Sequence, residues 1–351
     1  MTGTIQHHAR LHSREKLIVS KLLQFLCIVF TISVLSIFFA RVNSDNYIRD
    51  PYAPIYALTP QEIAKFGSIP TEVTAGLFVR DVPKFDPVKG NFTLDVVVWF
   101  LFDPRLVSLE RLRNFYFEKS EVISKAEPQV SIKGDNLFAR FDMRLKLDVV
   151  FDYREFPFDD HRLNLILVHE GFTPAEVSFE AVRGNLELSP LMSILGWHCF
   201  DWRVAPGFMR QKFAMRERTT GETYYPTIVF SLDFERVGIR HIISIFIPLL
   251  LIIFIALFTF SIDPLGTNAG SIVTLSATAV TALIAYRFVI EAMSPGVGYL
   301  LCSDYVFLVS IIMTCAIFFI NVFWAMSARG YKTAVVLAAH GLIILAFFLS
   351  V

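Results

Sequence analysis

The sequence has no excess of charge of either sign. Its 351 residues include 32 Lys and Arg against 32 Asp and Glu, so the formal net charge is zero. Nothing in this balance indicates a nucleic-acid partner, because binding a polyanion needs a basic surface. Cysteine is also scarce, and its spacing excludes a regular disulfide framework or a cysteine metal site. The four cysteines, expected to be free thiols, are Cys27, Cys199, Cys302 and Cys315.

Motifs of enzymes are missing as well. The chain has no Gly-rich phosphate loop and no nucleophile elbow. His169 and Glu170 are adjacent, but no third group completes a catalytic set, so a surface or core pair is expected. The acidic run 159–161 has metal-binding residue types, yet adjacent side chains on a strand point to opposite faces, so we expect a solvated loop. We therefore predict no enzyme activity, no cofactor and no metal site.

Apolar residues, in contrast, are abundant. They make up 54% of the chain, which is too high for an ordinary soluble protein. An uncharged run of about 20 residues can cross a bilayer core of roughly 30 Å as a helix. Such runs predict an extra N-terminal hydrophobic helix and an α-helical transmembrane four-helix bundle. The five segments are 22–40, 242–262, 268–290, 305–328 and 333–351.

Basic residues give these segments a direction. Four of them lie between positions 10 and 21, and Arg329 and Lys332 lie between the last two segments. If both groups are cytoplasmic, residues 41–241 and the C-terminus lie outside. Cleavage after Ala40 would place Phe38 where a small side chain is preferred, so a retained signal anchor is favoured over a signal peptide. Either choice leaves the middle domain on the same side.

The middle of the chain has the pattern of strands. "NFTLDVVVWFLF" is rich in β-branched and aromatic residues, and "LFARFDMRLKLDVVFDY" and "RLNLILVH" alternate apolar and polar positions. Turn signals such as "IKGDN" and "TPAE" separate them. This pattern predicts an all-β, immunoglobulin-like sandwich. The predicted domains are 1–41 (basic leader and helix), 42–240 (sandwich) and 241–351 (four helices).

One predicted membrane helix carries hydroxyl groups. In "SIVTLSATAVTALIAYRF", residues 271–288, the side chains of Thr274, Thr278, Thr281, Ala285 and Phe288 fall within a sector of about 80°. Small and hydroxylated residues help membrane helices to pack closely. Alternatively, several copies of this face could surround a water-filled pore. Both interpretations stand at this point.

Five motifs in order resemble the pentameric ligand-gated ion channels, the Cys-loop receptor superfamily, over residues 70–351. The resemblance rests on the strand pair ending in Asp103-x-x-Leu106 and on the loop "FPFDDHRLNL". It also rests on "YYPTIVFSLDFER", on the twelve-residue spacing from Arg236 to Pro248, and on "VTLSATAVTALIAYRFVIEAMSP". The cysteines that close the family's signature loop correspond here to Val149 and Leu163. With the very short "RGYK" connection, this departure is typical of prokaryotic members.

The resemblance implies a homopentamer in the plasma or inner membrane of a prokaryote, with a periplasmic sandwich. It implies a central pore for monovalent ions, with Phe288 as the bulky apolar constriction. Cations are favoured, because Glu291 and Asp263 lie near the two mouths and attract them. The implied pore-lining residues are Gly270, Thr274, Thr278, Thr281, Ala285, Phe288 and Glu291.

The resemblance also implies a coupling region and a ligand site. The coupling residues are Asp86, Phe156, Pro157, Phe158, Asp159, Arg236, Pro248 and Pro295, with an Asp159–Arg236 ion pair and a Phe-Pro-Phe tip pressing on the loop 294–299. A small-molecule agonist, such as an amine, would bind near Glu170, Phe172, Tyr224 and Tyr225, or Glu170 would respond to protons. The alternative from another class is a non-conducting, membrane-anchored sensor or adhesion protein whose threonine face is buried between helices.

Overall fold

The computed structural model describes residues 32, 48, 50–64, 66–67, 69–86, 89–214, 220–237, 240–262, 268–324 and 341. Several predicted features lie outside these residues, apart from single positions. They are the N-terminal helix 22–40, the last segment 333–351, Asp263 and the basic clusters. The chain divides into two units. One contains Tyr47–Asp152 and Asp159–Val237, and the other contains Tyr153–Phe158 and the segment from Gly238 onward.

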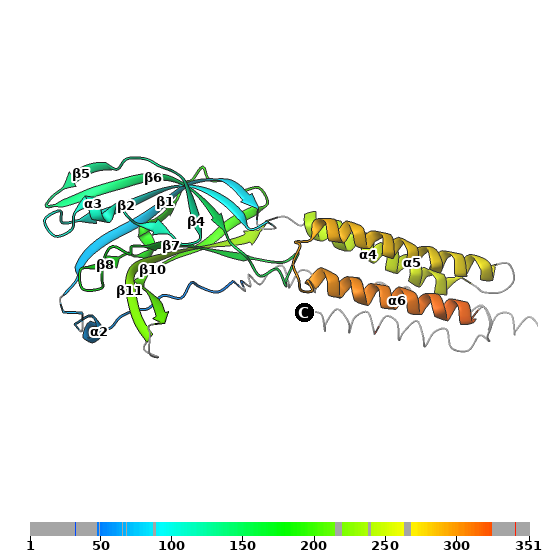
Figure 1. Ribbon diagram of the computed structural model, residues 1–351. Coiled ribbons are helices and arrows are strands. Elements are labelled where there is room, and N and C mark those ends of the chain that lie inside the picture. The colour runs from blue at the N-terminus through cyan, green and yellow to red at the C-terminus, as the bar shows by residue number, and fades with distance from the viewer. Residues whose placement is uncertain are drawn as a thin grey trace, which may run out of the picture. The chain divides into compact units, whose positions relative to one another are not determined.

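The first unit is a large β-sandwich-like domain of two sheets (Figure 1). One sheet has seven strands in the order β4-β6-β2-β1-β8, with β5 paired to β6 and β9 paired to β1. The other has four strands in the order β10-β11-β7-β3. The bounds in the first sheet are β1 Thr71–Asp86, β2 Asn91–Phe102, β4 Ser120–Lys125, β5 Gln129–Lys133, β6 Asn136–Asp148, β8 Val177–Glu180 and β9 Leu186–Leu188. Those in the second are β3 Tyr116–Phe117, β7 His161–Val168, β10 Trp197–Ala214 and β11 Thr220–Arg236.

The sequence alternation explains which faces are buried. Side chains at every second position of a strand share one face, and an apolar set on that face packs against the facing sheet. In β2, Phe92, Phe100 and Phe102 are each at most 1% exposed, and in β7 Leu163 and Leu165 are fully buried. The core therefore lies between the two sheets. The predicted strands in β2, β6 and β7 are present, whereas β10 was not predicted.

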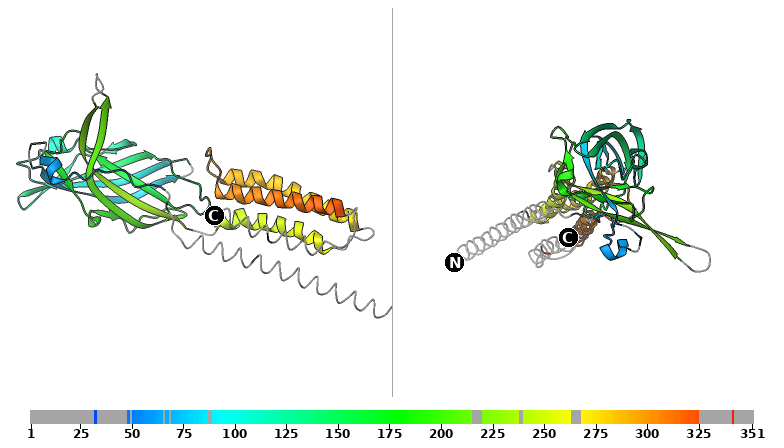
Figure 2. Two further views of the ribbon diagram at one scale, coloured as in Figure 1. Left: turned by 90° about the horizontal axis from the view of Figure 1, so that it is seen from below. Right: turned by 90° about the vertical axis from the view of Figure 1, so that its left-hand side faces the viewer.

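Short helices are few in this unit. They are α2 Pro60–Ala64, α3 Leu109–Leu112 and the 3-10 turn η1 Arg183–Asn185. Only four residues of the region 104–125 are helical, and strands β3 and β4 take up part of the remainder. The β10–β11 hairpin pairs from Trp197↔Arg236 to Ala214↔Thr220, with one register shift between Cys199 and Asp201, and extends beyond the other strands (Figure 2).

An N-terminal segment crosses the four-stranded sheet. Tyr56 and Phe208 of β10 exchange backbone hydrogen bonds of 2.9 and 2.8 Å. The side-chain amide (Nδ2) of Asn164 on β7 donates a hydrogen bond to the backbone carbonyl of Pro51 at 3.0 Å. Arg162 places its guanidinium 3.4 Å from the ring centroid of Tyr52. These contacts fix residues 50–56 on the sheet.

The second unit contains helices α4 Arg240–Phe258, α5 Asn268–Met293 and α6 Cys302–Trp324, with the 3-10 turn η2 Thr259–Ser261 after α4. The three helices lie side by side (Figures 1 and 2). Segments 270–293 of α5 and 302–322 of α6 are long and apolar enough to cross a membrane, and 242–258 is a shorter apolar helix. This composition is compatible with a membrane protein.

Candidate functional site

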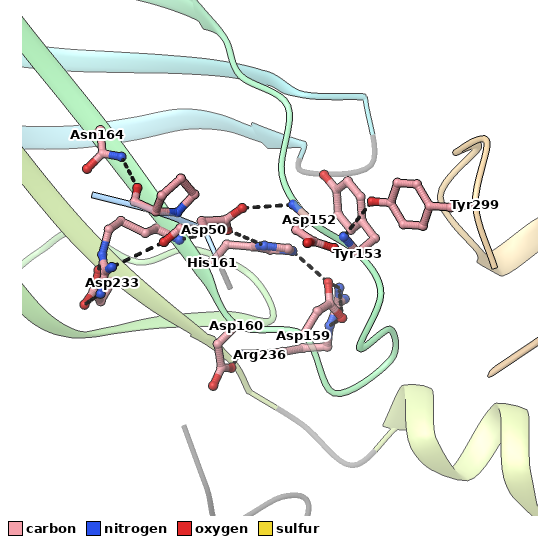
Figure 3. A network of polar contacts seen from close by, with 12 residues as sticks. Asp50, Asp152, Tyr153, Asp159, Asp160, His161, Asn164, Asp233, Arg236 and Tyr299 are labelled. Carbon is pink, nitrogen blue, oxygen red and sulfur yellow. Dashed lines mark hydrogen bonds and ion pairs between the residues drawn. The ribbon is translucent and has the colours of Figure 1, made fainter. Parts of the chain in front are cut away.

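A buried imidazole is the centre of an ionic cluster in the sandwich unit. His161, the first residue of β7, is fully buried. Its Nδ1 atom lies 3.0 Å from Asp50 Oδ2, and its Nε2 atom lies 2.7 Å from Asp159 Oδ2 (Figure 3). Burial lowers the pKa of His161, but the two carboxylates outweigh this effect by hydrogen bonding and charge, so the pKa is raised above its ordinary value. A protonated imidazole would donate to both carboxylates.

Arg236, the last residue of β11, forms the other side of this cluster. Its Nη2 atom lies 3.0 and 2.9 Å from the two carboxylate oxygens of Asp159. The side chains are 12% and 1% exposed, so the ion pair is shielded from solvent. Burial raises the pKa of Asp159, but His161 and Arg236 outweigh it and hold the pKa below its usual range. The ion pair predicted from the sequence is therefore present.

Asp50 is the member of the cluster that sequence reasoning missed. Besides His161, its carboxylate accepts hydrogen bonds from the backbone N–H groups of Asp152 at 2.9 Å and Arg162 at 3.2 Å (Figure 3). The guanidinium of Arg162 in turn forms a bidentate ion pair with the carboxylate of Asp233, with N–O distances of 2.7 and 2.8 Å. Asp50 lies 111 residues before His161, and no local pattern marks such a partner.

The expectation of a solvated acidic loop at 159–161 was wrong. Asp159 and His161 are 2% and 0% exposed. Because they are two positions apart rather than adjacent, they share one face, and the side chain of Asp160 accepts from the backbone N–H of Arg236 at 3.3 Å instead. Within the described ranges, no group of three or more His, Cys, Asp and Glu residues could hold a metal ion. Both imidazole nitrogens already face carboxylates.

Asp160 gives a pH-dependent prediction. Burial, with the nearby charges of Glu235 and Asp159, raises its pKa to about 6, against the hydrogen bond from Arg236. A raised carboxyl pKa means that stability present at low pH is lost as the pH rises through about 6. At pH values above 6, we expect Asp160→Asn to raise the thermal unfolding midpoint, by the equivalent of less than about 1 kcal/mol after solvent screening. Near pH 4, we expect the midpoint of this variant to differ little from that of the wild type.

The control for this prediction is Asp135→Asn, which removes an exposed carboxylate from the β5–β6 turn. Thermal unfolding of the full chain, followed by tryptophan fluorescence between pH 4 and 8, measures both variants. A pH-independent effect of Asp160→Asn would contradict the assignment.

The Phe-Pro-Phe segment belongs to the helical unit. Phe156 is 1% exposed, and its carbonyl accepts from the backbone N–H of Ser303 at 3.2 Å. The ring of Phe158 stacks on Phe246 of α4 at 5.6 Å between centroids. The hydroxyl of Tyr299 accepts from the backbone N–H of Tyr153 at 2.9 Å (Figure 3). The segment thus contacts α4, the start of α6 and one residue of the predicted loop 294–299.

The other predicted coupling residues are more dispersed. Pro157 and Pro295 are buried, Pro248 lies within α4, and Asp86 accepts from the backbone N–H of Lys89 at 3.1 Å in the turn after β1. No ion pair in the described part of the chain involves Asp86. The role predicted for these residues stays a prediction.

The threonine face of α5 is exposed in the single chain. Thr274, Thr278, Thr281 and Ala285 are exposed, as are Gly270 and Glu291, and Phe288 is 71% exposed. The opposite face is buried against the other helices, through Ile272, Ser276, Ala279, Leu283 and Ile290. Helix packing is therefore carried by the second face.

The three threonine hydroxyls have a common orientation. Each donates to the backbone carbonyl four residues earlier: Thr274 to Gly270 at 2.9 Å, Thr278 to Thr274 at 2.8 Å, and Thr281 to Ala277 at 3.0 Å. Because each hydroxyl proton is used within the helix, the remaining lone pairs are the groups available to the exposed side.

Polar contacts between the helices were not predicted from the sequence. Arg287 on α5 pairs with Asp304 on α6, and the hydroxyl of Tyr286 donates to the carbonyl of Ser244 on α4. Asn321 on α6 donates to the hydroxyl of Thr259 at 2.7 Å, and both side chains are buried. Such pairs satisfy polar groups inside a helical bundle and fix its register.

The predicted ligand-binding residues are only partly together. Glu170 is exposed and accepts from the hydroxyl of Tyr116 at 2.7 Å and from Gln211 at 3.4 Å. Burial and the contact with Glu170 raise the pKa of Tyr116, so it remains a hydrogen-bond donor. Tyr224 and Tyr225 are half-buried near the described end of the β10–β11 hairpin.

Phe172 does not join this group. It is 2% exposed, and its ring lies 4.3 Å from the ring of His169 and 4.4 Å from the guanidinium of Arg111. His169 is fully buried, and its Nε2 atom lies 2.9 Å from the carbonyl of Arg111. Burial lowers the pKa of His169 and favours the neutral imidazole, so of the two positions left open for this histidine, surface or core, it occupies the core.

No protein-family model matches the chain. Over 183 residues the chain is 25% identical to the neuronal acetylcholine receptor subunit alpha-3 of Bos taurus and to that of Homo sapiens. The match covers 51% of this chain and 34% and 33% of the two relatives, so the chain spans about a third of their length. This is a weak and distant similarity to a receptor subunit.

Proposed function

We propose that the chain is one subunit of a homopentameric ligand-gated ion channel. The exposed threonine face of α5 carries this proposal, since a face used for packing within the subunit would be buried, as Ser276 is. Five copies of a spanning helix with hydroxyls on its free face would line a wet pore. The distant similarity to a receptor subunit supports a receptor rather than an enzyme.

Cations are the proposed permeant ions. The hydroxyls of Thr274, Thr278 and Thr281 donate within their own helix, so oxygen lone pairs would face the pore. Oxygen lone pairs replace the hydration of a cation better than that of an anion. Glu291, exposed near the end of α5, adds a ring of negative charge in a pentamer. Phe288 would form the closed constriction.

The remaining assignments are part of the same proposal. The sandwich would be periplasmic in a prokaryotic member without the loop disulfide, and domains 1–41, 42–240 and 241–351 would be anchor, ligand-binding domain and pore. An amine or a proton would act near Glu170, Tyr224 and Tyr225, with Phe172 as a buried support. The cluster of Asp159, His161 and Arg236 would couple this event to the helices.

The pore assignment is tested by Thr278→Lys, measured by currents of the purified chain in planar bilayers during pH steps and with a panel of amines. Five lysines around one pore would repel cations, so we expect cation conductance to fall by at least about tenfold. Thr278→Ser, which keeps the hydroxyl, is the matched control and should conduct like the wild type.

Normal cation current in Thr278→Lys, at a normal protein level, would contradict the pore assignment. Particles without five-fold symmetry, or wild-type protein that never conducts, would instead favour the membrane-anchored sensor.

A further inference from the structure

The sandwich unit contains a cavity of about 580 Å³ between the edges of its two sheets. Its walls come from β1, β9, the connection 189–196 and the start of β10. Three aromatic side chains line it, Phe78, Trp197 and Trp202, together with aliphatic side chains such as Leu186 and Leu188. This size and lining are those of a small-molecule site, which is concave, mostly apolar and carries few polar groups.

One carboxylate at this cavity has no partner in the described part of the chain. Glu187 lines the cavity and is exposed, and its side chain forms no ion pair or hydrogen bond there. Two basic side chains, His198 in the cavity lining and Arg183 before β9, already have partners. His198 Nδ1 lies 2.9 Å from Glu235, and Arg183 Nη2 lies 2.6 Å from Asp201. Glu187 therefore leaves uncompensated negative charge at the cavity.

We propose that this cavity binds an organic ammonium ion with an aromatic or aliphatic body. The face of a phenyl ring attracts cations, and Phe78 offers such a ring, whereas the rings of Trp202 and Trp197 already lie 5.2 Å from the guanidinium of Arg183 and 4.4 Å from that of Arg236. Glu187 would pair with the ammonium group, and the aliphatic walls would cover the apolar body. Glu170, Tyr224 and Tyr225 do not line the cavity, so this site is distinct from the proposed agonist site and does not depend on conduction.

Trp197 would place the bound ligand beside the ionic cluster. Its side chain is 9% exposed, and its ring lies 4.4 Å from the guanidinium of Arg236 and 5.4 Å from the ring of His161. A ligand that shifts this indole changes the surroundings of both cluster residues. Because Trp197 and Trp202, two of the four tryptophans, line the cavity, tryptophan fluorescence is expected to respond to occupancy.

The test uses the full chain in phosphatidylcholine nanodiscs, titrated with 2-phenylethylamine and with its uncharged analogue 2-phenylethanol. Calorimetry and tryptophan fluorescence are the readouts. We expect saturable binding of the amine and weaker binding of the alcohol. Glu187→Gln should weaken amine binding by about tenfold and leave the alcohol unchanged, because only the charge pairing is removed. Glu180→Gln, which removes an exposed carboxylate outside the cavity, is the matched control.

A second variant, Ser193→Trp, places a bulky side chain in the cavity wall and should abolish binding of both probes. All titrations are carried out in the Glu170→Gln background, which removes the carboxylate of the proposed agonist site and so isolates amine binding at the cavity. The proposal is overturned if amine and alcohol bind alike, or if neither binds below about 10 mM. It is equally overturned if Glu187→Gln binds the amine as its parent chain does, or if Glu180→Gln weakens amine binding as much as Glu187→Gln.

Discussion

Replacement of Arg236 by alanine is expected to lower the free energy of unfolding of the sandwich by about 3–5 kcal/mol, because it leaves the buried carboxylate of Asp159 without its guanidinium partner. That carboxylate is 1% exposed, so water does not replace the lost guanidinium. The variant also loses the contact of the guanidinium with the Trp197 ring at 4.4 Å. Thermal or urea unfolding of the full chain, followed by tryptophan fluorescence, measures the effect.

Arg236→Lys and Arg105→Ala are the controls for this result. Lysine keeps the positive charge but cannot form a bidentate pair, so we expect an intermediate decrease in the free energy of unfolding. Arg105 also pairs with an aspartate, Asp103, but its side chain is 70% exposed, and its removal should change the free energy of unfolding little. Equal effects of Arg236→Ala and Arg105→Ala would show that burial does not matter here.

If the channel proposal holds, Arg236→Ala also impairs gating or assembly, and normal currents at a normal surface level would contradict that role.

His161→Leu is expected to destabilise the sandwich by about 3 kcal/mol or more at pH 6, since it removes the group between two buried carboxylates. Asp50 and Asp159 approach opposite nitrogens of this imidazole at 3.0 and 2.7 Å. The pKa of His161 is raised in the folded protein, so the stability that its proton confers is present below the unfolded pKa of about 6.5. This contribution is lost as the pH rises through the raised folded pKa.

The wild type should therefore lose stability with rising pH over that window, and His161→Leu should flatten this part of the curve. Unfolding midpoints between pH 5 and 9 test the sign. Charged groups that face the imidazole include Asp50, Asp159 and, through Asp159, Arg236, and Asp160 titrates nearby. The Asp160→Asn variant removes the change in stability that Asp160 causes at about pH 6. The change that remains at higher pH is then assigned to His161. An unchanged slope in His161→Leu would show that another group titrates.

Local sequence patterns predicted several of the long strands and helices, but they did not predict a strand that depends on pairing with a distant segment. The alternating runs in β2, β6 and β7 predicted their strands, because a half-buried strand needs apolar residues at every second position. The runs around α4, α5 and α6 predicted helices because their apolar length is itself the signal. The 18-residue strand β10 was missed. Its sequence "WHCFDWRVAPGFMRQKFA" interrupts the alternation with Pro and Gly, and long-range pairing with β11 stabilises it.

By itself, the sequence determined the order of strands and membrane-length helices and the hydroxylated stripe on α5, because spacing along the chain encodes each of them. The Asp159–Arg236 pair was implied by the family resemblance and not by spacing. Tertiary structure alone decided that Asp50 reaches His161 from 111 residues away, that Phe172 is buried, and that Trp197 lies between a cavity and an ionic cluster. Those facts depend on which strands become neighbours and on which face each side chain takes. Periodicity fixes a local face, whereas only the folded sheets fix what that face meets.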